Sequence, residues 1–248
     1  MHSITKTLSS VRVFAAGVIV SGLSMGSAQA QIVVDLNNPA DYTIQEIIDG
    51  NGLRVGDKVF DDFSIVSTGT TGITLPDADS VKVKGGLDST GNIELEFFGG
   101  WVAGTNELVN STIEFTVTAD SPFLIEAVEL SMQNFAAFGA GQVNIAENIF
   151  LDEDETVIGI APPFLNTFYE GNTGTLVNLD TATVIPGPQS TLYVSKDITV
   201  RDLSDGNQAS SAHLSRFTQT YIQIPEPGTV VLLLSGGALM MMRRRSEG

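Results

Sequence analysis

The chain has 248 residues, no cysteine, and 12 basic against 29 acidic residues, for a formal net charge of −17 at pH 7. The lack of cysteine excludes disulfides, thiolate metal sites and cysteine nucleophiles. Because so acidic a surface repels nucleic acid and anionic lipid, we expect neither to be a partner.

The first 30 residues have the parts of a secretory signal peptide. A positively charged start precedes an apolar run over residues 13–23, and Ala28 and Ala30 form a small-x-small cleavage site. We therefore predict a signal peptide over residues 1–30, removed by signal peptidase, with Gln31 as the mature N-terminus.

One segment after this site has helical spacing. Ile44, Ile47 and Ile48 fall on one face of a helix, Asp41 precedes them as a candidate N-cap, and Gly50 follows them. We predict a short helix of two turns here.

Most of the remaining chain up to Ile224 alternates apolar and polar residues with the period of two that half-buried strands require. Ile93 to Phe97 and Ile113 to Ala119 alternate without an exception. Further strand candidates are 58–66, 81–84, 128–132, 142–151, 156–160, 175–185, 191–201 and 214–224. Turn residues separate the strands, at Gly85-Gly86, Gly99-Gly100, Asp120-Ser121-Pro122, Gly139-Ala140-Gly141, Pro186-Gly187-Pro188 and Asp205-Gly206-Asn207. The sequence thus predicts an all-β ectodomain over residues 31–224: a single antiparallel, jelly-roll-like β-sandwich.

Two features are candidates for ligand binding. Asp152 and Asp154, in the acidic run from Asp152 to Glu155, could bind calcium through alternate carboxylates; the alternative is a solvated turn without a metal. Trp101 is the candidate platform for a sugar ring, and its alternative role is packing in the core. We expect no other cofactor or metal, and we expect the phenylalanines to lie mostly in the core.

The sequence identifies no catalytic residues. His213 is the only histidine after residue 30, and no serine lies in a nucleophile-elbow sequence. The histidines and cysteines that a transition-metal site needs are missing. We therefore predict that the protein is not an enzyme. A hydrolase that uses two carboxylates remains an alternative, because glycoside hydrolysis needs only those.

Residues 225–248 have three differently built parts in order. Pro225-Glu226-Pro227 comes first, an uncharged stretch follows over residues 228–242, and Arg243-Arg244-Arg245 comes last. As a helix the stretch would be roughly 22 Å long, shorter than a hydrocarbon core of about 30 Å. The arginines favour the cytoplasmic side of the membrane. We predict a short membrane helix that serves as a transient anchor.

This arrangement resembles the PEP-CTERM sorting signal of exported proteins in Gram-negative bacteria. The resemblance implies export, transient anchoring in the inner membrane, and processing near the Pro-Glu-Pro motif by a membrane protease of the exosortase type. Delivery to the cell surface or the extracellular matrix would follow. Gly50 to Phe63 and Leu192 to Gln219 also resemble segments of such proteins, which implies a β-rich ectodomain family with no assigned chemistry.

These observations predict a non-enzymatic envelope or extracellular-matrix protein that is sorted to the cell surface and associated with exopolysaccharide or biofilm. A carbohydrate-binding module is the first alternative. A secreted, carboxylate-dependent hydrolase is the second.

Overall fold

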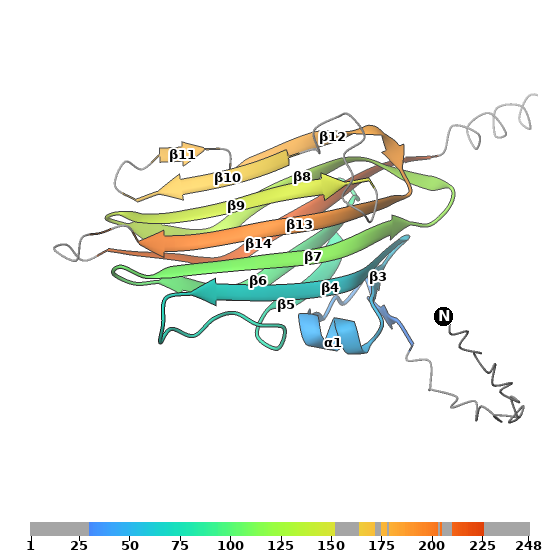
Figure 1. Ribbon diagram of the computed structural model, residues 1–248. Coiled ribbons are helices and arrows are strands. Elements are labelled where there is room, and N and C mark those ends of the chain that lie inside the picture. Colours follow the sequence, from blue (N-terminus) through green and yellow to red (C-terminus); the bar gives the residue numbers. More distant parts are fainter. Residues whose placement is uncertain are drawn as a thin grey trace, which may run out of the picture.

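The structure, a computed structural model, describes residues 30–151, 164–171, 175–177, 179–202, 204 and 210–225. Within these ranges the chain forms two β-sheets that lie face to face, with one short helix beside them (Figure 1). The described strands pair antiparallel, apart from the parallel pair of β1 (Ile32–Val33) with β3 (Leu53–Val55). The predicted all-β sandwich is thereby confirmed.

The larger sheet has eight strands. Its order is β1, β3, β4 (Lys58–Gly69), β7 (Leu108–Ala119), β13 (Thr191–Asp202), β9 (Gly141–Phe150), β10 (Phe164–Glu170) and β11 (Thr175–Val177). The smaller sheet has six strands, in the order β12 (Asp180–Gln189), β8 (Phe123–Phe138), β14 (Ser211–Pro225), β6 (Ile93–Ala103), β5 (Lys82–Leu87) and β2 (Asp41–Thr43). Because β13 and β14 are consecutive in the chain but belong to different sheets, these two strands face each other across the core.

The core lies between the inner faces of the two sheets and is rich in aromatic rings. The buried aromatic residues are Phe60, Phe63, Phe97, Trp101, Phe115, Phe217 and Tyr221. Phe97 of β6 stacks on Phe217 of the neighbouring strand β14, with ring centroids 4.8 Å apart. Most of the expected core phenylalanines are at least half-buried, but Phe138 is 66% exposed, at the turn between β8 and β9.

The predicted helix is confirmed as α1 (Ile44–Asp49), but its predicted N-cap is wrong. Asp41 lies in β2, and Thr43 caps the helix instead. The Thr43 hydroxyl accepts a hydrogen bond from the Glu46 amide, and the Glu46 carboxylate accepts one from the Thr43 amide, at 3.1 and 2.8 Å. This reciprocal pair satisfies two backbone donors at once, which a lone aspartate could not do. Ile47 is buried, as predicted, whereas Ile48 is exposed.

Two glycine pairs that were predicted as strand breaks lie inside strands. A Cβ atom on Gly85 of β5 would come within 2.3 Å of Val55 Cγ2 in the opposite sheet. A Cβ atom on Gly99 of β6 would come within 2.4 Å of the Trp101 ring. Glycine at these positions therefore permits close packing within a strand and does not mark a turn.

The other predicted breaks have mixed outcomes. The turns at Asp120-Ser121-Pro122 and at Gly139-Ala140 are confirmed. Pro186-Gly187-Pro188 lies within β12, where the register shifts between Val184 and Gln189. Because β12 is an edge strand, prolines without an amide donor are tolerated there. The strand predicted at 156–160 and the turn at 205–207 lie outside the described residues.

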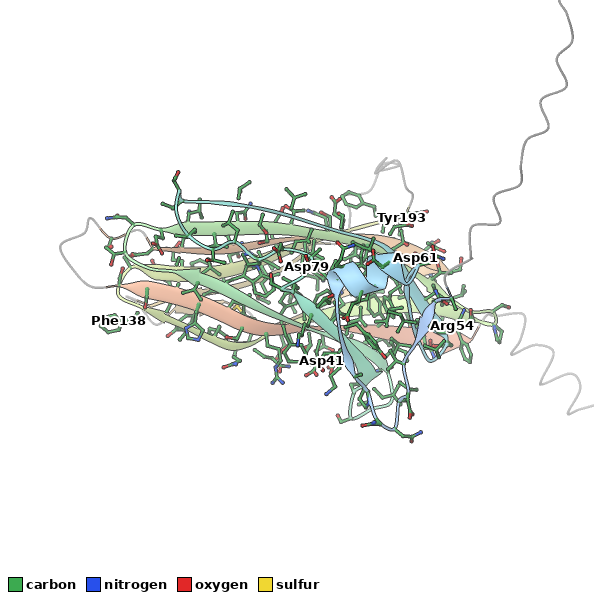
Figure 2. All side chains as sticks on the ribbon, turned by 90° about the horizontal axis from the view of Figure 1, so that it is seen from below. Asp41, Arg54, Asp61, Asp79, Phe138 and Tyr193 are labelled. Carbon is green, nitrogen blue, oxygen red and sulfur yellow. The ribbon has the colours of Figure 1, made fainter. Side chains whose placement is uncertain are left out.

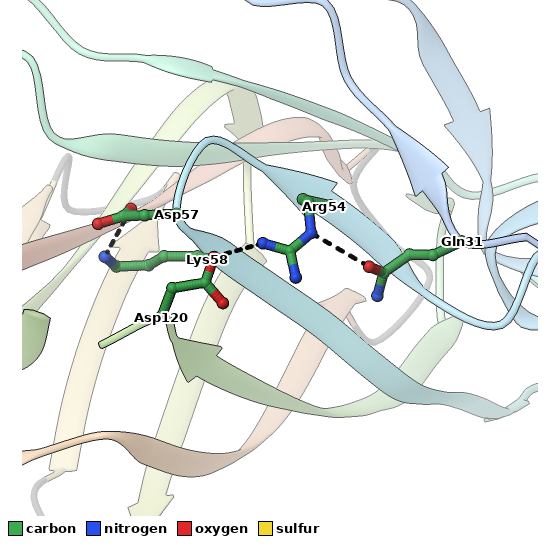
Figure 3. Close-up of polar contacts among 5 residues, drawn as sticks. All are labelled: Gln31, Arg54, Asp57, Lys58 and Asp120. Atoms are coloured by element: carbon green, nitrogen blue, oxygen red, sulfur yellow. Dashed lines mark hydrogen bonds and ion pairs between the residues drawn. The ribbon is translucent and has the colours of Figure 1, made fainter. Parts of the chain in front are cut away.

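The first described strand starts, and the last one ends, at the same end of the sandwich, here called the terminal end. Gln31 accepts a hydrogen bond from Arg54 Nε at 3.3 Å, and Arg54 Nη1 pairs with Asp120 Oδ2 at 2.5 Å (Figure 3). Phe123, three residues after Asp120, pairs with Pro225, the last residue of β14. The segments that precede and follow the sandwich therefore start from the same end of it.

Candidate functional site

The outer face of the eight-stranded sheet carries rows of polar side chains. Strand alternation sends one set of residues outward, and the antiparallel register aligns them across β4, β7, β13 and β9. The three central rows consist of Ser64, Glu114, Ser195 and Asn148; of Thr112 and Asp197; and of Thr68, Asn110, Thr199 and Asn144. Within them, Thr112 donates a hydrogen bond to Asp197 at 2.7 Å, and Thr199 donates one to Asn110 at 2.8 Å.

A shallow hollow, here called the Tyr193 groove, lies at one end of these rows. Its lining consists of Asp62, Glu114, Phe115, Thr116, Phe150, Tyr193, Val194 and Ser195. Figure 2 shows Tyr193 and Asp61 towards the end that carries Arg54, with Phe138 at the opposite end. The groove is therefore close to the terminal end.

Tyr193 and Phe150 form an aromatic pair in this groove. They are cross-strand partners of β13 and β9, and each is half-buried, so each ring keeps part of its surface open to solvent. Their neighbours Leu192, Val194 and Ile149 point inward and are buried. The alternation that places those residues in the core thus places the two rings outside, side by side.

Carboxylates flank the aromatic pair. The register of β4 with β7 shifts between Asp61 and Ser64, and Asp62 has a left-handed backbone with φ of 53°. A bulge of this kind re-aims a side chain, and it places the exposed Asp62 beside Asp61. The Thr116 hydroxyl lies within hydrogen-bonding distance of both carboxylates, 3.2 Å from Asp62, and shares its single proton between them. Glu114 accepts weaker hydrogen bonds from serine hydroxyls on either side, at 3.4 and 3.5 Å.

A second hollow, here called the Phe168 groove, lies on the same face, further along β13. It is lined by Gln142, Asn144, Phe168, Thr199 and Arg201. Arg201 Nε donates to Gln142 at 2.8 Å, and Gln142 donates in turn to Glu170 at 2.9 Å. The six residue steps from Tyr193 to Thr199 correspond to roughly 20 Å of strand. The face thus has an aromatic residue towards each end, with polar rows between them.

Such a surface can bind an extended polyhydroxyl ligand. An exposed aromatic ring offers an apolar face for stacking, and carboxylates, amides and hydroxyls accept and donate hydrogen bonds. The sequence prediction missed both Tyr193 and Phe150. A signal for Tyr193 was present, because it occupies the outward position between Leu192 and Val194.

Trp101 does not form the platform for a sugar ring that we considered from the sequence. Its side chain is completely buried, and its indole N–H donates to the Ser111 hydroxyl at 3.0 Å. Phe217 packs against it with ring centroids 5.8 Å apart. The alternation along β6 points Trp101 into the core, and Gly99 leaves room for its ring.

Several predicted sites lie outside the described residues. These are the candidate calcium ligands Asp152 and Asp154, the cleavage-site residue Ala28, the motif residues Glu226 and Pro227, and the basic tail Arg243, Arg244 and Arg245. Within the described ranges, no three His, Cys, Asp or Glu side chains gather in a way that could hold a metal ion. The helix in the described part of the chain is too short to cross a membrane.

His213 lies in β14 and is half-buried. Its cross-strand partners are Val102 of β6 and Ala136 of β8. Both neighbours in register are apolar, and a histidine base in a catalytic triad needs a carboxylate and a hydroxyl beside it.

The chain matches no protein-family model and no curated protein. The solved structures that it matches include two weakly similar carbohydrate-binding modules. One is the carbohydrate-binding module TmCBM61 in complex with β-1,4-galactotriose, at 12% identity and a TM-score of 0.27, covering 65% of this chain and 89% of that chain. The other is a family 11 carbohydrate-binding module from Clostridium thermocellum in complex with a β-1,3-1,4-mixed-linked tetrasaccharide, at 8% identity and a TM-score of 0.17, covering 70% and 91%. At these scores neither structure assigns a site in this chain.

Proposed function

We propose that residues 31–224 form a non-catalytic glycan-binding sandwich of an exported protein, and that the outer face of the eight-stranded sheet is the binding surface. The observation that carries this proposal is the half-buried pair of Tyr193 and Phe150 beside the carboxylates Asp62 and Glu114. Aromatic rings bordered by a few oriented polar groups are the usual composition of small-molecule sites.

The charge of the chain limits the class of glycan. A formal net charge of −17 repels an anionic polysaccharide, and the groove adds carboxylates of its own. Carboxylates are also strong acceptors for sugar hydroxyls. The ligand we infer is therefore a neutral, extended polysaccharide that lies along β13, from the Tyr193 groove to the Phe168 groove.

Replacing Tyr193 with alanine is expected to weaken binding of a neutral polysaccharide roughly tenfold or more, because the stacking face is lost. Tyr193→Phe keeps the ring and should bind nearly as well as the wild type. The measurement is calorimetric titration of the detergent-solubilised full chain with neutral β-glucans, galactans and mannans.

Phe138→Ala is the matched control, because Phe138 is an exposed aromatic residue at the opposite end of the sandwich. Equal affinity for the Tyr193→Ala variant and the wild type would move the site elsewhere. Release of reducing sugars that stops in a Glu114→Gln variant would instead support the hydrolase alternative.

We further propose that the protein is exported and sorted through its C-terminal signal, so that the sandwich meets its polysaccharide at the cell surface or in the matrix. Three features of the sequence support this: the small residues Ala28 and Ala30 at the cleavage site, the Pro-Glu-Pro motif, and the triple arginine. Gln31 and Pro225, where the described sandwich starts and ends, both lie at the terminal end. A sandwich that is tethered to the membrane through its C-terminal segment therefore leaves its opposite end free.

In a host that carries a protease of the exosortase type, Glu226→Ala is expected to leave an unprocessed, membrane-retained form. Glu247→Ala, beyond the arginines, should be processed normally. Peptide mapping of the surface-exposed protein should find a start at Gln31 and an end beside Pro225 to Gly228. A mature form that still contains Arg243 to Arg245 would contradict the sorting proposal.

A further inference from the structure

A lysine, a glutamate and a glutamine meet in the middle of the apolar core. Lys196 lies on β13, Glu147 is its cross-strand partner on β9, and Gln219 comes from β14 in the opposite sheet. None of the three side chains has exposed surface. Burial of so many polar groups costs free energy unless each group has a hydrogen-bond or charge partner.

The contacts place the glutamate between the other two groups. Lys196 Nζ donates to Glu147 Oε2 and also contacts the side-chain carbonyl oxygen of Gln219. Gln219 Nε2 donates to Glu147 Oε1 at 2.7 Å. The Glu147 carboxylate thus contacts two groups. One is the amine of Lys196, which could attack the Gln219 amide carbon, and the other is the Gln219 amide nitrogen, which would leave.

The burial of Lys196 shifts its protonation equilibrium towards the neutral, nucleophilic amine. The rings of Phe97, Phe115 and Phe217 surround Lys196 Nζ, with centroids 5.8 to 6.0 Å away. Burial lowers the pKa of Lys196, although the neighbouring Glu147 opposes that shift. The three rings could also stabilise an ammonium ion, so a buried ion pair is the competing state.

We propose that Lys196 and Gln219 become joined by an intramolecular amide bond, with Glu147 as the proton-transfer residue. The lone pair of Lys196 Nζ attacks Gln219 Cδ and forms the new C–N bond. Glu147 takes a proton from the attacking nitrogen and delivers a proton to Nε2. The bond between Cδ and Nε2 then breaks, and ammonia leaves with the electron pair. Amine and primary amide give secondary amide and ammonia, so no oxidant or other reactant is needed.

The bond would join the two sheets at their centre. β13 and β14 are inner strands of the eight- and six-stranded sheets, and the bond would close the loop of chain between them. The chain has no cysteine, so an exported sandwich of this sequence cannot be stapled by disulfides. A lysine–glutamine bond would supply the same constraint on the unfolded chain without a redox step.

Lys58 provides an internal comparison. It is also buried and contacts the amide oxygen of Gln223, and its nearest carboxylate is Asp57, 3.2 Å from Nζ (Figure 3). Asp57 makes no hydrogen bond to the amide of Gln223, both being described residues. The second Asp57 oxygen is buried and has no partner. Without a carboxyl that links the amine to the leaving nitrogen, Lys58 lacks the proton path, and the proposal is confined to Lys196.

Mass spectrometry of the detergent-purified full chain tests the proposal. After denaturation and digestion, the peptides that contain Lys196 and Gln219 should be recovered covalently joined, at their summed mass less one ammonia. Trypsin should fail to cleave after Lys196. Glu147→Gln keeps the shape but cannot transfer the proton, so it should yield the two peptides separately, whereas the surface variant Lys84→Arg should retain the bond.

The wild-type chain alone decides the question, even where a variant does not fold. Recovery of Lys196 and Gln219 in separate, unmodified peptides from the folded wild type would overturn the proposal and leave the buried ion pair. Because no glycan takes part in this measurement, its outcome is independent of the proposed binding function.

Discussion

Trp101→Ala is expected to lower the free energy of unfolding by roughly 3–5 kcal/mol, the usual cost of removing a large aromatic side chain from a packed core. The indole is fully buried against Phe217, and its loss leaves the Ser111 hydroxyl without that donor. Gly99 has no side chain that could move into the cavity from its side of the ring. Urea denaturation followed by circular dichroism measures the change.

Two further variants separate packing from ligand binding. Trp101→Phe refills part of the space and should recover part of the stability. Ser111→Ala removes the hydrogen-bond partner alone; it should cost less than Trp101→Ala. A Trp101→Ala protein of wild-type stability that has lost glycan binding would contradict the core assignment and return Trp101 to the binding site.

Glu147→Ala is the second substitution with a large expected effect, again roughly 3–5 kcal/mol of unfolding free energy. Removing one partner of a buried pair leaves the other group uncompensated in a low-dielectric interior. Lys196 would remain among three phenylalanine rings with only the Gln219 carbonyl as a partner. Thermal and urea unfolding both report the loss.

The matched comparison is the triple variant Lys196→Met, Glu147→Leu and Gln219→Leu. Apolar side chains of similar volume remove all three polar groups together, a replacement that is often neutral or stabilising. The triple variant should therefore be more stable than Glu147→Ala. Neither protein can form the lysine–glutamine bond, so the comparison does not depend on it. A triple variant that is less stable than the single one would show that the polar cluster itself stabilises the core.

The period-two pattern predicted most of the sandwich, because one face of each strand is buried and the other is wet. In the structure, burial alternates along Ile93 to Phe97 as the sequence predicts, and along Ile113 to Ala119 it does so except at Thr116, which is buried. The glycine pairs misled the prediction. Gly85 and Gly99 look like turn residues, but whether a glycine bends the chain or admits a neighbouring side chain depends on what packs against it.

The candidate site was less predictable than the fold. Tyr193 and Phe150 are far apart in the sequence and meet because β13 pairs with β9. Strand order cannot be deduced from alternation, since any two half-buried strands have the same pattern. The same holds for Lys196 and Glu147: each interrupts an apolar inner face, yet the sequence alone does not say that they face each other or that Gln219 reaches them across the core.

By itself, the sequence determined the strand-rich body, the strongly acidic charge, the absence of disulfides and the one short helix, because these follow from composition and from local periodicity. The sequence also predicts the sorting signals that we propose for both ends, since such signals depend on the order of charged, apolar and small residues. Only the tertiary structure decided that Trp101 is internal, that the aromatic pair lies on the outer face, and that a lysine, a glutamate and a glutamine are buried in contact with one another. These relations depend on which strands become neighbours, which is set by the packing of the whole sandwich and not by any one segment.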